Sequence, residues 1–380
     1  MSSTERTTAT EGTPTTGAVT SHPLASVNLH QRVQAALDVH ISAQREVLAE
    51  LGPEVSDLVD AVASLLAGGK RLRAGFLYWG YRAFNNEDSD ELVACASALE
   101  VFQAAALLHD DVMDKSDTRR GKPTAHRAFA AQHQAAGWQG DPEDFGRAAA
   151  ILAGDMCLNW CDEIYTTSGM PSIELARARP TFDLMRTQLM AGQYLDVLHS
   201  MRDWADLNYE QRIAQSRAVI RYKSAKYTIE HPLLIGAQAA GAPPEAIADL
   251  STYGMALGEA FQLRDDVLGV YGNPESTGKP AGDDLREGKR TVLIAHALEH
   301  SNTDDCDFLL KSLGQHDLSA VDVERCREIL IHSGAVERTE EMISEQSDIA
   351  AESLSRITQA TSEGLDALHS LIDISTARAT

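Results

Sequence analysis

The amino-acid sequence predicts an all-α protein, and two observations support this prediction. From about Val27 onward, almost every segment places apolar residues three and four positions apart, which is the period of an α-helix. No segment shows the sustained apolar-polar alternation that is typical of a β-sheet. The chain has 380 residues, of which 43% are hydrophobic, so it can bury a large core either as one helical unit or as two domains.

The predicted elements follow one another closely along the chain. The first 22 residues are rich in Ser and Thr and lack the apolar stretch of a secretory signal, so we expect a disordered tail. Helices are predicted at 27–51 and 55–69, and the second ends at a glycine pair, which suits a helix C-terminus. Further helices are predicted at 73–84, 90–114, 124–135, 145–168, 172–200, 209–240, 244–271, 289–300, 305–314, 320–332 and 335–376, with irregular stretches at 115–126, 133–146 and 272–290.

Composition and charge exclude several classes of function. The formal net charge is −23, from 56 acidic and 33 basic residues, so no basic field exists that would attract nucleic acid or an anionic lipid surface. No run of eighteen apolar residues is present, so no membrane span is expected. The five cysteines are few and odd in number, which predicts reduced thiols in the cytoplasm rather than a disulfide framework.

Two predicted helices carry the same acidic pattern near their C-terminal ends. Asp110, Asp111 and Asp114 lie in DDVMD, and Asp265 and Asp266 lie in DDVLG. A Phe-Gln pair precedes each pattern, and a glycine-containing loop with Lys and Arg follows it. Since Asp110 and Asp114 are one helical turn apart, their charges repel and favour a cation between them.

A hard divalent cation suits this arrangement. Mg²⁺ takes one or two carboxylates and shares its other coordination positions with water and substrate phosphate. A solvated acidic helix end is the alternative for either pattern alone, but the repetition of the pattern with a basic loop favours metal binding. The spacing matches neither an EF-hand calcium loop nor a Walker A phosphate loop.

Basic residues form four separated groups that indicate anion binding. Arg can grip a phosphate through two parallel hydrogen bonds, and Lys contributes a point charge. Each group follows a glycine turn or flanks an aspartate. The groups are Lys70, Arg71 and Arg73; Arg119 and Arg120; Lys223 and Lys226; and Lys279, Lys289 and Arg290.

These motifs resemble those of the trans-isoprenyl diphosphate synthases, the polyprenyl synthetase family, and most of all its bacterial geranylgeranyl diphosphate synthases. GGKRLR at 68–73 is similar to the family's GGKRxRP element, DDVMDKSDTRRG at 110–121 to its first aspartate-rich motif, and FQLRDDVLG at 261–269 to its second. The resemblance implies one polyprenyl synthetase domain over 23–380. This domain is an isoprenoid-synthase-type helical bundle around a deep central cavity, usually in a homodimer.

The resemblance also implies roles for individual residues. The catalytic residues would be Asp110, Asp111, Asp114, Asp265 and Lys223, and the Mg²⁺ ligands would be Asp110, Asp111, Asp114, Asp265 and Asp266. The allylic substrate, which is dimethylallyl, geranyl or farnesyl diphosphate, would contact Gln103, Arg119, Lys223, Gln262 and Lys279. Isopentenyl diphosphate would contact Lys70, Arg73 and Arg120.

Three positions depart from the family's commonest pattern. Gln103 stands where many members have His, but its amide still donates a hydrogen bond to a diphosphate. Gly269 replaces the last Asp of the second motif, which weakens that metal site and leaves Asp283 and Asp284 downstream as further carboxylates. Ala74 replaces a Pro, a change that we expect to be harmless.

The implied reaction needs no side-chain nucleophile. The allylic C–O bond ionises, the double bond of isopentenyl diphosphate attacks the cation, and a proton is lost. His109 and His126 are therefore expected either to be structural or to support the residues that bind the substrates. Ala104, Ala105 and Ala106 leave room beneath the reacting end with Phe102 as a floor, which predicts a C20 product, geranylgeranyl diphosphate.

Two alternatives belong to other functional classes. A class I terpene cyclase ionises the same kind of substrate but uses an Asn, Ser and Glu triad, and the chain has no NDxxSxxxE-like segment. A non-catalytic regulatory subunit of a prenyl synthase would be expected to lose acidic or basic motif residues, which this chain mostly retains.

Overall fold

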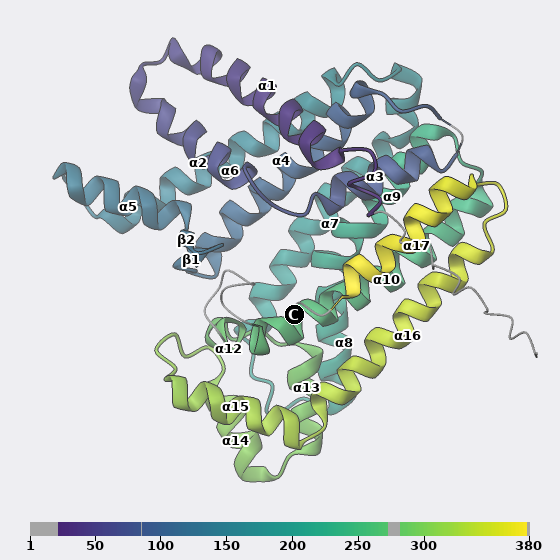
Figure 1. Ribbon diagram of the computed structural model, residues 1–380. Helices are drawn as coiled ribbons and strands as arrows, with labels where there is room; N and C mark the ends of the chain where they lie inside the picture. The colour runs from purple at the N-terminus through teal and green to yellow at the C-terminus, as the bar shows by residue number, and fades with distance from the viewer. Residues whose placement is uncertain (1–21, 85, 273–281, 378–380) are drawn as a thin grey trace, which may run out of the picture.

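The computed structural model describes residues 22–84, 86–272 and 282–377, and confirms the all-α prediction (Figure 1). Most helices begin and end within three residues of the predicted bounds. The N-terminal half contains α1 (Leu29–Ala49), η1 (Pro53–Val55), α2 (Ser56–Leu66), α3 (Leu72–Arg82), α4 (Asp90–Met113), β1 (Thr118–Arg119), β2 (Lys122–Pro123), α5 (Ala125–Ala136), α6 (Pro142–Thr167) and α7 (Ser172–Ser200).

The C-terminal half is helical as well, and two helices have the predicted bounds, at 244–271 and 320–332. It contains α8 (Tyr209–Val219), η2 (Ile220–Glu230), α9 (His231–Ala240), α10 (Pro244–Tyr271), α12 (Asp283–Glu287), α13 (Val292–His300), α14 (Thr303–Ser312), α15 (Ala320–His332), α16 (Ala335–Ser355) and α17 (Ser362–Thr376).

The predicted single helix at 209–240 is three consecutive segments. The middle one, η2, has the wider hydrogen-bond pattern of a π-helix. No loop separates the three segments, and they differ only in the pattern of their backbone hydrogen bonds. The spacing of apolar residues in the sequence does not reveal this difference. Lys223 belongs to this π-helical segment, and its position therefore depends on a feature that the sequence pattern did not reveal.

The prediction of one helix over 335–376 was wrong. The chain breaks after Ser355 and starts α17 at Ser362, where the Thr361 side chain accepts a hydrogen bond from the backbone N–H of Gly364. Thr is a common N-cap because its oxygen satisfies an otherwise unpaired N–H of the first turn. The prediction of irregular structure was also incomplete at two stretches. Residues 115–126 contain the antiparallel pair β1–β2, and 272–290 contain the short helix α12.

Caps explain other boundaries. Asp141 accepts a hydrogen bond from the backbone N–H of Glu143, and Pro142 occupies the first helical position, so α6 begins inside the predicted irregular stretch 133–146. Asn208 and Gln211 form a reciprocal capping box at the start of α8.

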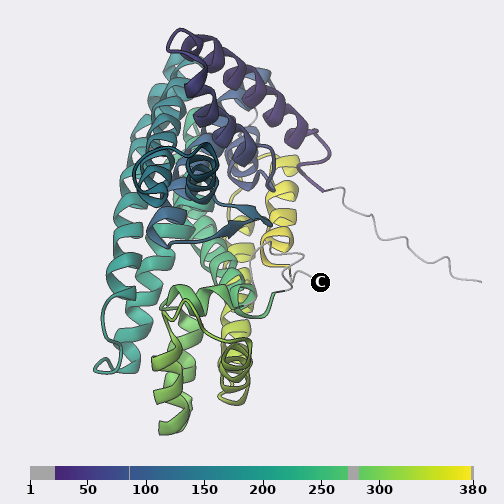
Figure 2. The same ribbon diagram turned by 90° about the vertical axis from the view of Figure 1, so that its left-hand side faces the viewer.

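Apolar side chains form two principal cores. The larger core joins helices from α1 to α10 with α16 and α17 and contains Trp79, Phe102 and Phe182. The second lies among α13, α14 and α15 and includes Trp204. The N-terminal helices α1 and α2 occupy one end of the molecule and α14 and α15 the other, as both views show (Figures 1 and 2).

Helix α4 has the length and hydropathy of a possible membrane span, which the sequence analysis did not predict. It is long and apolar enough to cross a membrane by length and composition, with a mean hydropathy of 1.6 over its best window. However, 72% of that window is buried inside the protein, which is the environment of a core helix of a soluble protein.

Candidate active site

A cavity of about 530 Å³ lies between α4, α7, η2, α10 and α12. Both acidic patterns reach it, from α4 on one side and from α10 on the other. The predicted site residues that line it are Lys70, Arg73, Gln103, Asp110, Arg119, Arg120, Lys223, Gln262, Asp265 and Asp266. Asp111 and Asp114 are not among the lining residues, and Lys279 lies outside the described part of the chain.

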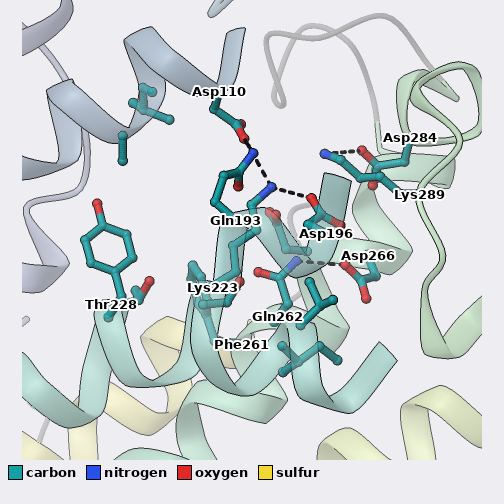
Figure 3. A pocket seen from close by; sticks show the side chains of 18 of the residues that line it. Asp110, Gln193, Asp196, Lys223, Thr228, Phe261, Gln262, Asp266, Asp284 and Lys289 are labelled. Carbon is teal, nitrogen blue, oxygen red and sulfur yellow. Dashed lines mark hydrogen bonds and ion pairs between the residues drawn. The ribbon is translucent and has the colours of Figure 1, made fainter. Parts of the chain in front are cut away.

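Asp110 is the aspartate of α4 that faces the cavity. Its Oδ1 accepts hydrogen bonds from Lys223 Nζ at 3.1 Å and from the Gln193 amide at 2.7 Å (Figure 3). Burial alone would raise the pKa of Asp110, but the cations Lys223, Lys289 and Arg119 outweigh this effect and lower it. Asp110 is therefore held as a carboxylate.

Asp111 has a different environment. It is 3% exposed, and the Arg119 guanidinium donates to its Oδ1 through Nε at 2.9 Å and through Nη2 at 2.6 Å. This bidentate pair fixes the guanidinium next to the cavity. Asp111 therefore lies against Arg119 and is not among the residues that line the cavity, and its role as a metal ligand stays a prediction.

Asp114, the C-cap residue that directly follows α4, is half-buried. Desolvation and the neighbouring charge of Asp110 raise its pKa to about 7, although Lys223 and Lys289 act in the opposite direction. The raised pKa reflects the repulsion that the sequence predicted between the two aspartates, which are one helical turn apart.

Two site residues on α7 were missed by the sequence reading. Asp196 Oδ2 lies 2.5 Å from Lys223 Nζ, and Gln193 binds Asp110, so both belong to the same polar network. Gln193 and Asp196 are three positions apart and share a helix face in AGQYLD, which is the signal that was available. The preceding Gly192 lets η2 approach, since a Cβ there would lie 2.5 Å from the Lys223 backbone nitrogen.

The second acidic group begins on α10. Asp265 is exposed toward the cavity, whereas Asp266 is 5% exposed and accepts a hydrogen bond from Gln262 Nε2 at 2.7 Å. Burial raises the pKa of Asp266 well above its usual value, and Asp284 and Asp265 add to the effect. Asp284 and Lys289 face the same space, with Lys289 Nζ 3.3 Å from Asp284 Oδ1 (Figure 3).

The predicted basic groups divide into lining and buried members. Lys70 and Arg120 are exposed at the cavity, and Arg73 lies over the Tyr227 ring at 4.1 Å while donating to Thr228 Oγ1 at 2.9 Å. Arg71 and Lys226, which the sequence grouped with the anion-binding candidates, are not among the residues that line the cavity.

Buried carboxylates hold both of these cations. Arg71 is 3% exposed and pairs with Glu100 at 3.2 Å, and Lys226 pairs with Glu230 at 2.7 Å.

The acidic residues suit a hard divalent cation that takes some of its ligands from water and substrate, because the protein does not surround the ion completely. Within 22–84, 86–272 and 282–377, His, Cys, Asp and Glu do not gather in threes as a ready-made metal site. Carboxylate oxygens from Asp110 on one wall and from Asp265, Asp266 and Asp284 on the other nevertheless face one cavity. Mg²⁺ commonly binds through few carboxylates together with water and substrate phosphate, so this donor set suits it.

Other candidate residues have structural surroundings. His126 is buried and hydrogen-bonds Thr124. His109 Nε2 lies 3.1 Å from the Ile151 carbonyl oxygen, and His109 also lines the cavity. Cys157 and Cys161 are both buried free thiols. Among the three alanines only Ala106 lines the cavity, and Phe102 lies behind Tyr227 in an edge-on contact at 5.7 Å rather than forming the floor itself.

Comparisons with known proteins agree with this geometry. Residues 55–330 match the Polyprenyl synthetase family. A geranylgeranyl pyrophosphate synthase from Corynebacterium glutamicum, solved with isoprenyl diphosphate and magnesium, is 39% identical with a TM-score of 0.87, covering 92% of this chain and 99% of that one.

Two curated relatives differ in product. A geranylgeranyl diphosphate synthase from Sulfolobus acidocaldarius is 31% identical over 267 residues, which is 70% of this chain and 73% of the relative. A geranylfarnesyl diphosphate synthase from Aeropyrum pernix is 30% identical over 311 residues, which is 81% and 89%.

Proposed function

The chain belongs to the polyprenyl synthetase family and is a prenyltransferase, and we propose that it condenses isopentenyl diphosphate head-to-tail with an allylic diphosphate to give mainly geranylgeranyl diphosphate. One observation carries the proposal. Asp110 of α4 and Asp265 and Asp266 of α10, which are distant in sequence, line one cavity together with the cations Lys223, Arg119 and Lys289.

The allylic diphosphate is proposed to bind between these groups. Mg²⁺, held by Asp110 with Asp114 and by Asp265 with Asp266, would neutralise the charge of the diphosphate when bound. Lys223 and the guanidinium that Asp111 orients on Arg119 present fixed positive charge to the leaving oxygens. Since these cations are already positioned by carboxylates, they need little reorganisation as the C–O bond breaks.

Isopentenyl diphosphate is proposed to bind beside the first substrate. Lys70 and Arg120 are exposed at the cavity and can engage its phosphates, while Arg73 is held between Thr228 and the Tyr227 ring. The bonding electrons of the allylic C–O bond leave with diphosphate, the isopentenyl double bond forms the new C–C bond, and a proton passes to the released diphosphate. No side-chain nucleophile takes part.

The proposal of a C20 product depends on the small side chain of Ala106 in the cavity wall. This small side chain lies one turn before Asp110 and lines the cavity, so it leaves space for a growing chain. Geranylgeranyl and geranylfarnesyl diphosphate synthases among the relatives support a product longer than C15.

We further propose a cytoplasmic homodimer built from one domain over 23–380. Exposed apolar side chains on α6 and α7 support an interface on this side of the molecule, because large apolar surfaces mark interaction sites. They are Ile151, Leu152, Leu184 and Tyr194.

The test is to incubate the purified protein alone with Mg²⁺, labelled isopentenyl diphosphate and dimethylallyl, geranyl or farnesyl diphosphate, and to size the products. A labelled C20 diphosphate supports the proposal. Consumption of an allylic diphosphate without incorporation of label would indicate a cyclase. Turnover that requires an added partner synthase would indicate a regulatory subunit.

A further inference from the structure

Gly269 occupies a position on α10 where the second acidic motif usually has its last carboxylate. It lies one turn after Asp265 on the same helix face and lines the cavity. A Cβ added at this glycine would lie 1.9 Å from Asp284 Oδ2 and 2.5 Å from Asp284 Cγ. Gly269 is not among the glycines with positive φ, so the position requires space rather than an unusual backbone conformation.

Asp284 is held in that space by its own segment. Helix α12 is bounded by Gly282 at φ 76° and Gly288 at φ 74°, both in the left-handed region that favours glycine. The Lys289 backbone N–H donates to the Asp284 carbonyl oxygen at 3.0 Å, and Lys289 Nζ lies 3.3 Å from the carboxylate. The side chain is therefore positioned from both ends, and it lies where a side chain at 269 would have to be.

We infer that Asp284 supplies, from a different segment of the chain, the third carboxylate of the α10 acidic group, and that it serves with Asp265 and Asp266 in holding a hard divalent cation. This inference rests on the proposed function, since the cation is the one that the reaction uses. It assigns Gly269 a defined role as the opening through which Asp284 reaches the site.

Lys289 completes this arrangement as the counter-ion of Asp284. Its ammonium group also lies 2.8 Å from Glu287 Oε2, so it links two of the three carboxylates of α12 at the cavity edge. Burial would lower the pKa of Lys289, but Asp284 and Glu287 outweigh this and raise it, with smaller contributions from Asp114 and Asp110. The lysine thus balances the acidic group from the side opposite to Lys223.

A cycle of substitutions in the metal-free protein tests the spatial part of the inference. Gly269→Ala should displace Asp284 and lower the Tm by about 2 °C or more, because the added Cβ overlaps the carboxylate. In an Asp284→Ala background the same change should leave the Tm unchanged or raise it, since Ala is the better helix former. Equal losses in both backgrounds would overturn the inference.

Metal binding tests the chemical part. Titration calorimetry of Mg²⁺ in the presence of inorganic diphosphate should show about 10- to 100-fold weaker Mg²⁺ binding in Asp284→Ala. The double variant Gly269→Asp with Asp284→Ala returns a carboxylate to α10 and should recover most of the affinity. Glu341→Gln, which removes one charge at an exposed site on α16, is the control and should bind as the original protein does.

Two results would contradict the assignment of Asp284 as a ligand. One is unchanged Mg²⁺ affinity in Asp284→Ala, and the other is a double variant no better than Asp284→Ala alone. These outcomes are separable from failure of the proposed function, because that failure appears as lack of prenyl transfer by the original protein.

Discussion

Lys223 Nζ on η2 and Asp110 Oδ1 on α4 lie 3.1 Å apart across the cavity, although the two residues are 113 positions apart in the chain. The same ammonium group contacts Asp196 on α7, so one cation joins three helices. Because both carboxylates raise the pKa of Lys223 despite its burial, the lysine stays charged throughout the physiological pH range.

Lys223→Met should lower kcat about 100- to 1,000-fold, because it removes a preorganised positive charge from the leaving diphosphate and leaves Asp110 without its closest cation. Steady-state kinetics at saturating Mg²⁺ would measure this loss. Arg221→Met, at an exposed position on the same π-helical segment, is the matched control and should retain activity. Comparable losses in both variants would show a general effect on η2 instead.

Ala106 should control product length in proportion to the volume placed there. In the series Ala106→Val, Ala106→Leu and Ala106→Phe, the main product should shorten stepwise toward C15 or C10, since a larger side chain fills the cavity one turn before Asp110. Product sizing by chromatography measures the trend. An unchanged C20 product in Ala106→Phe would reject this wall as the determinant of chain length.

Asp114 should make the metal-free protein less stable as the pH rises. Its pKa is about 7 in the folded protein and 3.8 is its ordinary value, so the folded state holds a proton that the unfolded state has lost between these pH values. The stabilising contribution is therefore fully present below about pH 4 and is lost as the pH rises through 7.

The measurement is Tm against pH in EDTA, taken as the difference between the original protein and Asp114→Asn. This difference isolates Asp114 from groups with the opposite trend, such as His231, whose pKa burial lowers to about 4. The original protein should lose Tm relative to the variant from pH 4 to 7. A pH-independent difference would contradict the prediction.

Glu100→Gln should destabilise the fold by about 3–5 kcal/mol, because it leaves the buried Arg71 guanidinium without its ionic partner. Denaturant unfolding would measure the change. Asp60→Asn, which breaks the exposed pair of Arg45 with Asp60, should cost no more than about 1 kcal/mol. Similar losses in both would refute the structural role of Arg71.

The sequence predicted the helices and most of the cavity lining because helical period and motif spacing are local properties. It did not separate Arg71, which has a φ of 55° and pairs with the buried Glu100, from Arg73, which lines the cavity. Nor did it place Asp284 against Gly269 or Asp196 against Lys223. Those contacts depend on how distant helices pack, for which no local pattern exists.

Gly192 should be essential to the network although its own side chain takes no part in it. Helix α7 packs so closely on η2 that a Cβ at 192 would lie 2.5 Å from the Lys223 backbone nitrogen and 2.6 Å from the Tyr222 carbonyl carbon. Backbone atoms cannot move aside as a flexible side chain can, so Gly192→Ala should push the two helices apart. Lys223 would then lose its contacts with Asp110 and with Asp196. Since a misplacement of about 1 Å can cost about 100-fold in rate, we expect a loss of that order in kcat together with a lower Tm.

Ala191→Ser, at the exposed neighbouring position, should change neither quantity. Full activity in Gly192→Ala would mean that the separation of α7 and η2 does not set the position of Lys223.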